Sequence, residues 1–94
     1  MVRSAWPRKA PGVPVSPPLP AELGLAIRWF RKKRDLSIEE LAGRADIHTT
    51  YLSGIELGKK NPSWNVIRSL AEELDVEASA FVILAEELAE PARD

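Results

Sequence analysis

Polar side chains that form hydrogen bonds are concentrated in one short stretch, residues 48–61 (HTTYLSGIELGKKN). The stretch opens with an imidazole and two hydroxyls at residues 48–50, and it ends with two ammonium groups and a carboxamide at residues 59–61. Hydroxyls both donate and accept hydrogen bonds, whereas an ammonium only donates and carries positive charge. These groups either cap a helix of the chain itself or are presented outward to a partner.

The residue types needed for catalysis or for a metal centre are scarce. The sequence has no cysteine and a single histidine, His48, which excludes a disulfide framework, a thiolate metal site and a cluster of histidine ligands. It also offers no nucleophile–base pair and no glycine-rich phosphate loop. We therefore expect no enzymatic activity, no metal, no cofactor and no small-molecule substrate.

Length and hydropathy favour a single domain. The 94 residues are 45% apolar, which is enough for one compact core. No apolar run approaches the ~20 residues needed to cross a bilayer, and the Pro-rich start does not resemble a signal peptide. We therefore expect no membrane partner and a cytoplasmic location.

Charge is distributed unevenly along the chain. The net charge is −1, yet residues 1–36 carry +6, residues 37–68 are neutral and residues 69–94 carry −7. Charge runs commonly form solvated faces, but a basic front also fits a nucleic-acid partner. The net charge by itself therefore does not exclude such a partner.

The chain divides into a Pro-rich start and a helical remainder. Residues 1–20 contain six prolines and no apolar periodicity, which predicts a disordered or extended arm in which Trp6 stands alone. Five later stretches carry apolar residues at helical spacing, beginning with Leu23, Ile27 and Phe30 and ending with residues 77–89. No stretch alternates as a strand does, so we expect an all-α fold of five helices.

Cap signals set the boundaries of the inner helices. Ser37 and Glu40 fit a capping box at the start of the second helix. His48 or Thr49 is expected to cap the third helix, which ends at Gly58.

The fourth helix has its own start signal. Asn61 is expected to cap it, with Pro62 at its first position, where a missing N–H costs nothing. Between the second and third helices, Asp46 and Ile47 form a tight turn. Two short helices joined in this way, the second with a polar outward start, follow the helix-turn-helix plan.

Residues 23–75 resemble the Cro/repressor-type helix-turn-helix domain of the XRE-like family. The matching motifs are Leu-Ser-x-x-Glu-Leu-Ala, Tyr-Leu-Ser-x-Ile-Glu-x-Gly-Lys and Asn-Pro-Ser. The string from His48 to Ser63 is also similar to the controller proteins of restriction–modification systems. The resemblance implies a lambda-repressor-like fold and a DNA-binding regulator whose recognition helix spans about residues 48–57.

Three positions depart from the family pattern. Ile38 stands where the family often has a glutamine that touches a phosphate, and Gly54 stands where members often carry a long base-reading side chain. Asp46 replaces a common turn glycine, and aspartate can still adopt the left-handed conformation. Ile38 and Gly54 together indicate weaker or less direct base reading.

The resemblance assigns roles around the third helix, which would enter the major groove with its first residues nearest the bases. The candidates for base contacts are His48, Thr49, Thr50 and Ser53. The candidates for phosphate contacts are Ser37, Arg44, Tyr51, Lys59, Lys60 and Asn61. The competing interpretations are helix capping for the threonines and His48, ring burial for Tyr51 and a solvated loop for residues 59–61.

The resemblance also implies a structural ion pair between Arg31 and Glu56, which would join the first and third helices and fix the tilt of the recognition helix. The alternative is that Arg31 is an unpaired surface residue.

The last helix carries more apolar surface than one core needs. Its apolar residues are Phe81, Val82, Ile83, Leu84 and Leu88. We expect this excess to form a homodimer interface, because exposed apolar patches usually mark interfaces. Two recognition helices would then lie one duplex turn apart, about 34–36 Å.

These predictions define three regions: residues 1–20 as the arm, 21–76 as the DNA-binding domain, and 77–94 as a dimerisation helix with an acidic tail. The predicted function is sequence-specific transcriptional regulation by a dimer bound to double-stranded DNA at an inverted-repeat operator. The alternative is a protein-interaction or antitoxin-like module that keeps the fold and binds DNA weakly. The sequence does not name the operator or the inducing signal.

Overall fold

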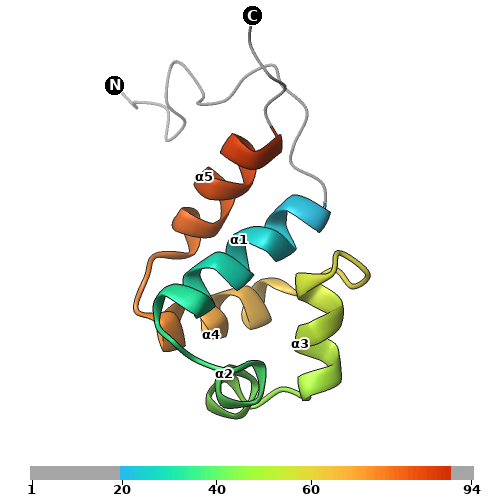
Figure 1. The fold of residues 1–94 in the computed structure, drawn as a ribbon, viewed down its shortest axis with the longest axis vertical. Coiled ribbons are helices and arrows are strands. Elements are labelled where there is room, and N and C mark those ends of the chain that lie inside the picture. The colour runs from blue at the N-terminus through green and yellow to red at the C-terminus, as the bar shows by residue number, and fades with distance from the viewer. Residues whose placement is uncertain (1–19, 90–94) are drawn as a thin grey trace, which may run out of the picture.

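The computed structural model describes residues 20–89, and this part of the chain contains five α-helices and no strand (Figure 1). The helices are α1 (Pro20–Lys33), α2 (Ile38–Ala45), α3 (Thr49–Glu56), α4 (Trp64–Leu74) and α5 (Ala78–Ala89). The predicted all-α fold of five helices is confirmed. Pro20 already belongs to α1, and the rest of the Pro-rich stretch, with Trp6, lies outside the described residues, as does the end of the acidic tail after residue 89. None of the described helices has the length and apolar character needed to cross a lipid bilayer.

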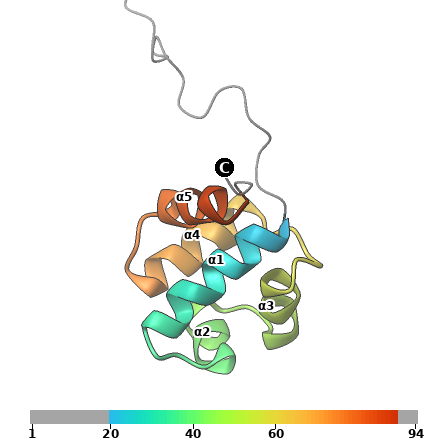
Figure 2. The same ribbon diagram turned by 45° about the horizontal axis from the view of Figure 1, so that its top comes forward.

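One core joins the helices. Each helix contributes at least one fully buried large side chain, and together these are Ile27, Leu41, Leu52, Ile55, Leu70, Leu74 and Phe81. Helix α1 runs through the middle of the domain, with α5 along one side and with α2 and α3 on the other (Figures 1 and 2). The core therefore holds α2 and α3 by their inner sides and leaves their outer sides free.

The start of α4 differs from the sequence prediction. Ser63, and not Asn61, is the N-cap: its Oγ accepts a hydrogen bond of 3.2 Å from the N–H of Val66. Pro62 precedes the cap and does not begin the helix. The prediction was wrong because Asn61 and Ser63 can both cap a helix, and the helix starts at the later of the two. Asn61 is left exposed in the preceding loop.

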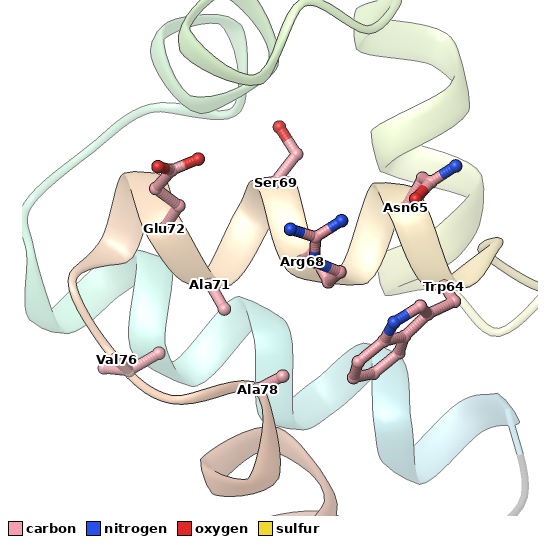
Figure 3. Close-up of a pocket in the computed structure, with 8 residues that line it drawn as sticks. All are labelled: Trp64, Asn65, Arg68, Ser69, Ala71, Glu72, Val76 and Ala78. Atoms are coloured by element: carbon pink, nitrogen blue, oxygen red, sulfur yellow. The ribbon is translucent and has the colours of Figure 1, made fainter.

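The first residue of α4, Trp64, is one of the most exposed apolar side chains in the described residues. It borders an open hollow formed by α4 and the segment that leads into α5 (Figure 3). The other lining residues are Asn65, Arg68, Ser69, Ala71, Glu72, Val76 and Ala78. No lining residue comes from α2 or α3, but the lining residue Ser69 donates a hydrogen bond of 3.3 Å to the carbonyl of Ala45 at the end of α2.

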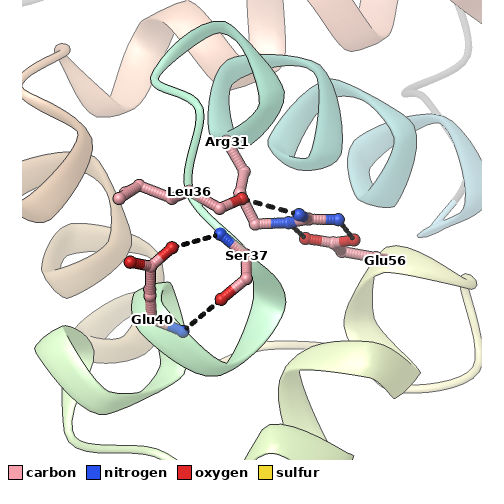
Figure 4. Close-up of polar contacts among 5 residues, drawn as sticks. All are labelled: Arg31, Leu36, Ser37, Glu40 and Glu56. Carbon is pink, nitrogen blue, oxygen red and sulfur yellow. Dashed lines mark hydrogen bonds and ion pairs between the residues drawn. The ribbon is translucent and has the colours of Figure 1, made fainter.

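Local chemistry sets the ends of α2 as predicted. The Ser37 hydroxyl accepts a hydrogen bond of 3.0 Å from the Glu40 N–H, and the Glu40 carboxylate accepts one of 2.8 Å from the Ser37 N–H (Figure 4). This reciprocal pair is the capping box. At the other end, Asp46 adopts the left-handed conformation with φ 60°, as the sequence analysis allowed.

Helix α3 ends in a Schellman motif. Gly58 has φ 77°, and its N–H donates to the Ile55 carbonyl at 3.0 Å, while the Lys59 N–H donates to the Gly54 carbonyl at 2.8 Å. This pattern of two bonds turns the chain sharply after a helix, and glycine meets its need for a positive φ without strain. The motif directs residues 59–61 back toward the end of α3.

Candidate nucleic-acid interface

Helix α3 is mounted directly on α1. A Cβ added to Gly24 of α1 would lie 2.6 Å from the carbonyl oxygen of Glu56, and the carbonyl oxygen of Ile55 is closer still. The two helix backbones therefore touch at a point where only glycine fits. Sequence reasoning missed Gly24, although a glycine inside a helix costs about 0.5–1 kcal/mol and is a signal that something requires it.

Arg31 and Glu56 form a two-pronged ion pair across the same joint (Figure 4). The Arg31 Nε donates to Glu56 Oε2 at 2.7 Å, and Nη2 donates to Oε1 at 2.9 Å. Arg31 is 9% exposed and Glu56 is 6% exposed. The hydrogen bond to the Glu56 carboxylate raises the pKa of Arg31 above its ordinary value.

A third bond from Arg31 extends the joint to the chain that leads into α2. Its Nη1 donates to the Leu36 carbonyl at 2.9 Å (Figure 4). One guanidinium thus connects α1, the approach to α2 and the C-terminal end of α3. Because no buried side-chain nitrogen or oxygen in residues 20–89 lacks a hydrogen-bond partner, the joint is complete within one chain.

The N-terminal half of α3 carries its polar groups outward. His48 occupies the N-cap position, but its side chain makes no capping hydrogen bond and is exposed. Thr49 is the first helical residue, and Thr50 is exposed, while Thr49 and Ser53 are half-buried. The inner side of the helix is taken by Leu52, Ile55 and Glu56. The hydroxyls therefore lie away from the core or at its edge.

The six candidates for phosphate contacts fall into two groups. Ser37 and Tyr51 already have internal partners, because the Ser37 hydroxyl is in the capping box and the half-buried Tyr51 packs against the core. The exposed residues are Arg44 in the last turn of α2 and Lys59, Lys60 and Asn61 in the loop after α3. The loop residues follow directly after α3, and the backbone bonds from Lys59 and Lys60 to the Gly54 carbonyl hold the start of the loop against that helix.

The predicted dimer helix needs one correction. Phe81 is fully buried and stacks edge to face on Phe30 of α1, with 5.7 Å between ring centroids. It belongs to the core of a single chain, so its place in the predicted interface was wrong. Val82, Ile83 and Leu88 are 40%, 55% and 48% exposed, and Leu84 is half-buried.

Helix α1 adds apolar surface that the sequence analysis did not assign. Leu25 and Trp29 are each 48% exposed and lie one turn apart on α1. The ammonium of Lys33 lies 5.2 Å from the centroid of the Trp29 ring. Since α1 packs against α5 (Figure 2), two neighbouring helices carry exposed apolar residues.

Charged residues elsewhere in the described part of the chain do not form a metal centre. Within residues 20–89, no group of three or more His, Asp and Glu residues is arranged to hold a metal ion.

Comparisons with known proteins identify the family to which this chain is similar. The family model for helix-turn-helix domains matches residues 27–81. An immunity repressor protein of Bacillus phage phi105 is 35% identical over 72 residues, which cover 72% of this chain and 50% of the repressor. The chain thus spans about half the length of this curated relative.

Two solved structures are similar in sequence and in shape. The restriction-modification controller protein C.AhdI from Aeromonas hydrophila is 32% identical with a TM-score of 0.65, over 66% of this chain and 94% of that protein. SinR, a master regulator for biofilm formation solved in complex with DNA, is 33% identical with a TM-score of 0.61, over 63% of this chain and 95% of SinR. Because the family model covers more than half of the sequence, the chain belongs to the helix-turn-helix family, and its resemblance to Cro/repressor-type domains is confirmed.

Proposed function

We propose that this chain is a sequence-specific DNA-binding transcriptional regulator that binds an inverted-repeat operator as a homodimer in the cytoplasm, with α3 as its recognition helix. The observation that carries the proposal is the outward, polar start of α3 on a helix whose inner side is locked to α1. The phage repressor and the DNA-bound SinR among its relatives support the same function.

Base contacts come from the first turns of α3. Thr50 is exposed and His48 has no capping bond, so both are available to a groove that α3 enters. Thr49 and Ser53 flank them with hydroxyls that can donate or accept, and a threonine methyl also fits against the thymine methyl. These four residues would select the sequence.

Phosphate contacts come from the exposed cations beside α3. Arg44, Lys59 and Lys60 supply charge, and Asn61 supplies an amide. Ser37 and Tyr51 contribute hydroxyls only where their internal contacts leave a lone pair or proton free. Such contacts raise affinity for any sequence and orient the protein on the duplex, while base contacts supply the choice of site.

The dimer forms through the exposed side of α5, with Val82, Ile83 and Leu88 as its apolar contacts and Leu84 at its edge. We include in this proposed surface Leu25 and Trp29, which are exposed on α1, the helix that packs against α5. In this proposal residues 21–76 bind DNA, while the helix within residues 77–94 sets the spacing between two recognition helices.

Selection of bound duplexes from a random DNA pool tests the proposal. We expect an inverted repeat with half-sites one or more duplex turns apart, and binding that weakens steeply as salt rises. Lys59→Ala should weaken binding to all sequences and reduce the salt slope by about 1 for each protomer bound. Arg68→Ala removes the same charge from α4, outside the interface, and is the matched control. Binding that is absent at low salt would refute the proposal.

A protein-interaction or antitoxin-like role is the second candidate. The exposed acidic residues Glu39 and Glu40 in the first turn of α2 favour it, because they would repel a phosphate there. Under this candidate the chain would bind a protein partner tightly and bind duplex DNA weakly, with no preferred sequence in the selection. The similarity to C.AhdI suggests a specific form of the first candidate, in which the chain controls a restriction–modification locus. Genes for a methyltransferase and an endonuclease beside the gene for this chain would support that form.

A further inference from the structure

The recognition helix contains a glycine whose place on the surface is filled from outside the helix. Gly54 lies four residues after Thr50, so the two share the outer side of α3. A glycine inside a helix is unfavourable relative to alanine because it gives up more backbone freedom. Its presence on an eight-residue helix therefore calls for a reason.

The side chain of Lys60 occupies the space that a residue at position 54 would need. A Cβ built on Gly54 would lie 2.7 Å from the Lys60 Cγ, 3.6 Å from its Cβ and 3.8 Å from its Cδ. These three nearest atoms all belong to one aliphatic stem, so Lys60 rests on the bare backbone of α3. Lys60 as a whole is still exposed, as expected when a lysine packs its stem and keeps its ammonium in water.

Backbone bonds hold Lys60 in this position. The Gly54 carbonyl accepts hydrogen bonds from the N–H groups of Lys59 at 2.8 Å and of Lys60 at 3.2 Å. The positive φ of Gly58 allows the chain to turn back so that both bonds form. Gly54 and Lys60 thus interact in two ways: the Lys60 N–H donates to the Gly54 carbonyl, and the Lys60 stem packs on the Gly54 backbone.

Gly43 shows that this arrangement is specific. It also lies inside a short helix, α2, yet a Cβ added there would meet nothing within 4 Å. Of these two glycines on the helix-turn-helix unit, only Gly54 has a neighbouring side chain seated on it.

We propose that Gly54 is a positioning residue for Lys60: the missing side chain allows the Lys60 stem to pack on the outer side of α3, and from there the Lys60 ammonium contacts a DNA phosphate. The inference rests on the proposed DNA-binding function. The seated stem loses little conformational freedom when the ammonium meets a phosphate, which favours binding. None of the three atoms nearest to a Cβ added at Gly54 belongs to the neighbouring Lys59.

The packing is tested first without DNA, by thermal unfolding of Gly54→Ala and Gly43→Ala. Gly43→Ala should raise Tm by about 2–6 °C, because alanine favours the helix and the site is open. Gly54→Ala should raise Tm less, or lower it, because the new methyl displaces the Lys60 stem. Equal increases for the two variants would overturn the inference.

The DNA contact is tested by a double-mutant cycle on a fluorescein-labelled duplex carrying the selected inverted repeat. Lys60→Met keeps an apolar stem and removes the charge, so it should reduce the salt slope by about 1 for each protomer bound and weaken binding up to about fivefold. Gly54→Ala alone should cause most of the same loss. In the Lys60→Met background, Gly54→Ala should change neither the slope nor the affinity further.

The matched control is the same cycle with Lys59→Met in place of Lys60→Met. In that cycle, the effects of Gly54→Ala and Lys59→Met on binding should be additive. If the wild-type chain binds the duplex but the effects of Gly54→Ala and Lys60→Met on binding are additive, this inference is wrong and the proposed function still holds. A wild-type chain that binds no duplex at low salt would instead overturn the proposed function, and this inference with it.

Discussion

The joint between α1 and α3 and the outer side of α5 differ in what one chain supplies to them: the joint is complete within residues 20–89, whereas the outer side of α5 keeps exposed apolar side chains. At the joint, the Glu56 carboxylate accepts two hydrogen bonds from Arg31 and the helix backbones touch at Gly24. On α5, Val82 and Ile83 remain exposed.

The difference has a physical cause. A buried charge without a partner costs several kcal/mol, so an ionic joint must be satisfied as the chain folds. An exposed apolar side chain lowers the stability of the folded chain far less, so it can remain in solvent until a second molecule covers it. On the function proposed above, the tilt of the recognition helix is therefore set within each protomer, and the spacing of two such helices is set by the dimer.

Breaking the ion pair should have the largest effect. Glu56→Ala is expected to lower the free energy of unfolding by about 3–5 kcal/mol, because it leaves Arg31 buried without its carboxylate. Urea denaturation measures this loss. The control is Arg34→Ala, which removes an exposed pair of 3.3 Å with Asp75 and should cost no more than about 1 kcal/mol. Losses of equal size for the two variants would show that the buried pair contributes no more to stability than the exposed pair does.

Filling the close approach at Gly24 should have the next largest effect. Gly24→Ala is expected to cost about 1–3 kcal/mol, because the atoms that must move are backbone atoms of α3. Gly43→Ala, at an open site, should instead stabilise by about 0.5–1 kcal/mol. Denaturation of the two variants side by side measures the contrast, and a stabilised Gly24→Ala would contradict the direct backbone contact.

Disrupting the outer side of α5 should change assembly more than folding. Ile83→Lys is expected to weaken the dimer about tenfold or more, since an isoleucine that would be buried is replaced by a charge in each copy. Sedimentation equilibrium measures the dissociation constant. Trp64→Ala removes an equally prominent apolar side chain from α4 and should leave the dimer intact. An unchanged dissociation constant for Ile83→Lys would place the interface elsewhere.

The smallest effect concerns pH and the capping box of α2. The Ser37 backbone N–H, followed by its hydroxyl, holds the pKa of Glu40 below its ordinary value of 4.5. A lowered folded pKa means that this carboxylate adds stability above pH 4.5, and that the gain is lost as the pH falls through the folded pKa.

We expect wild type to be slightly more stable than Glu40→Gln at neutral pH, with the difference shrinking toward zero in acid. Denaturant unfolding across this pH range measures the difference, and Glu39→Gln controls for loss of a charge in the same turn. A difference that stays constant with pH would argue against a role for the ionised box.

Most local features of this fold, the start of α4 excepted, could be predicted from sequence because they depend on residues only a few positions apart. The helical spacing, the capping box of Ser37 and Glu40 and the left-handed Asp46 are set within one or two turns of the chain. The Arg31–Glu56 pair was anticipated through family resemblance, since the two residues lie far apart in sequence. The DNA and dimer contacts remain proposals.

Tertiary structure alone decided how the helices meet. It showed that α1 needs Gly24 against the α3 backbone, that Phe81 faces inward while Ile83 faces outward, and that Lys60 lies over Gly54. Each of these depends on the distance and rotation between elements. Helical periodicity marks which residues share a side, but it does not say what that side will touch, because the packing of the whole core determines that.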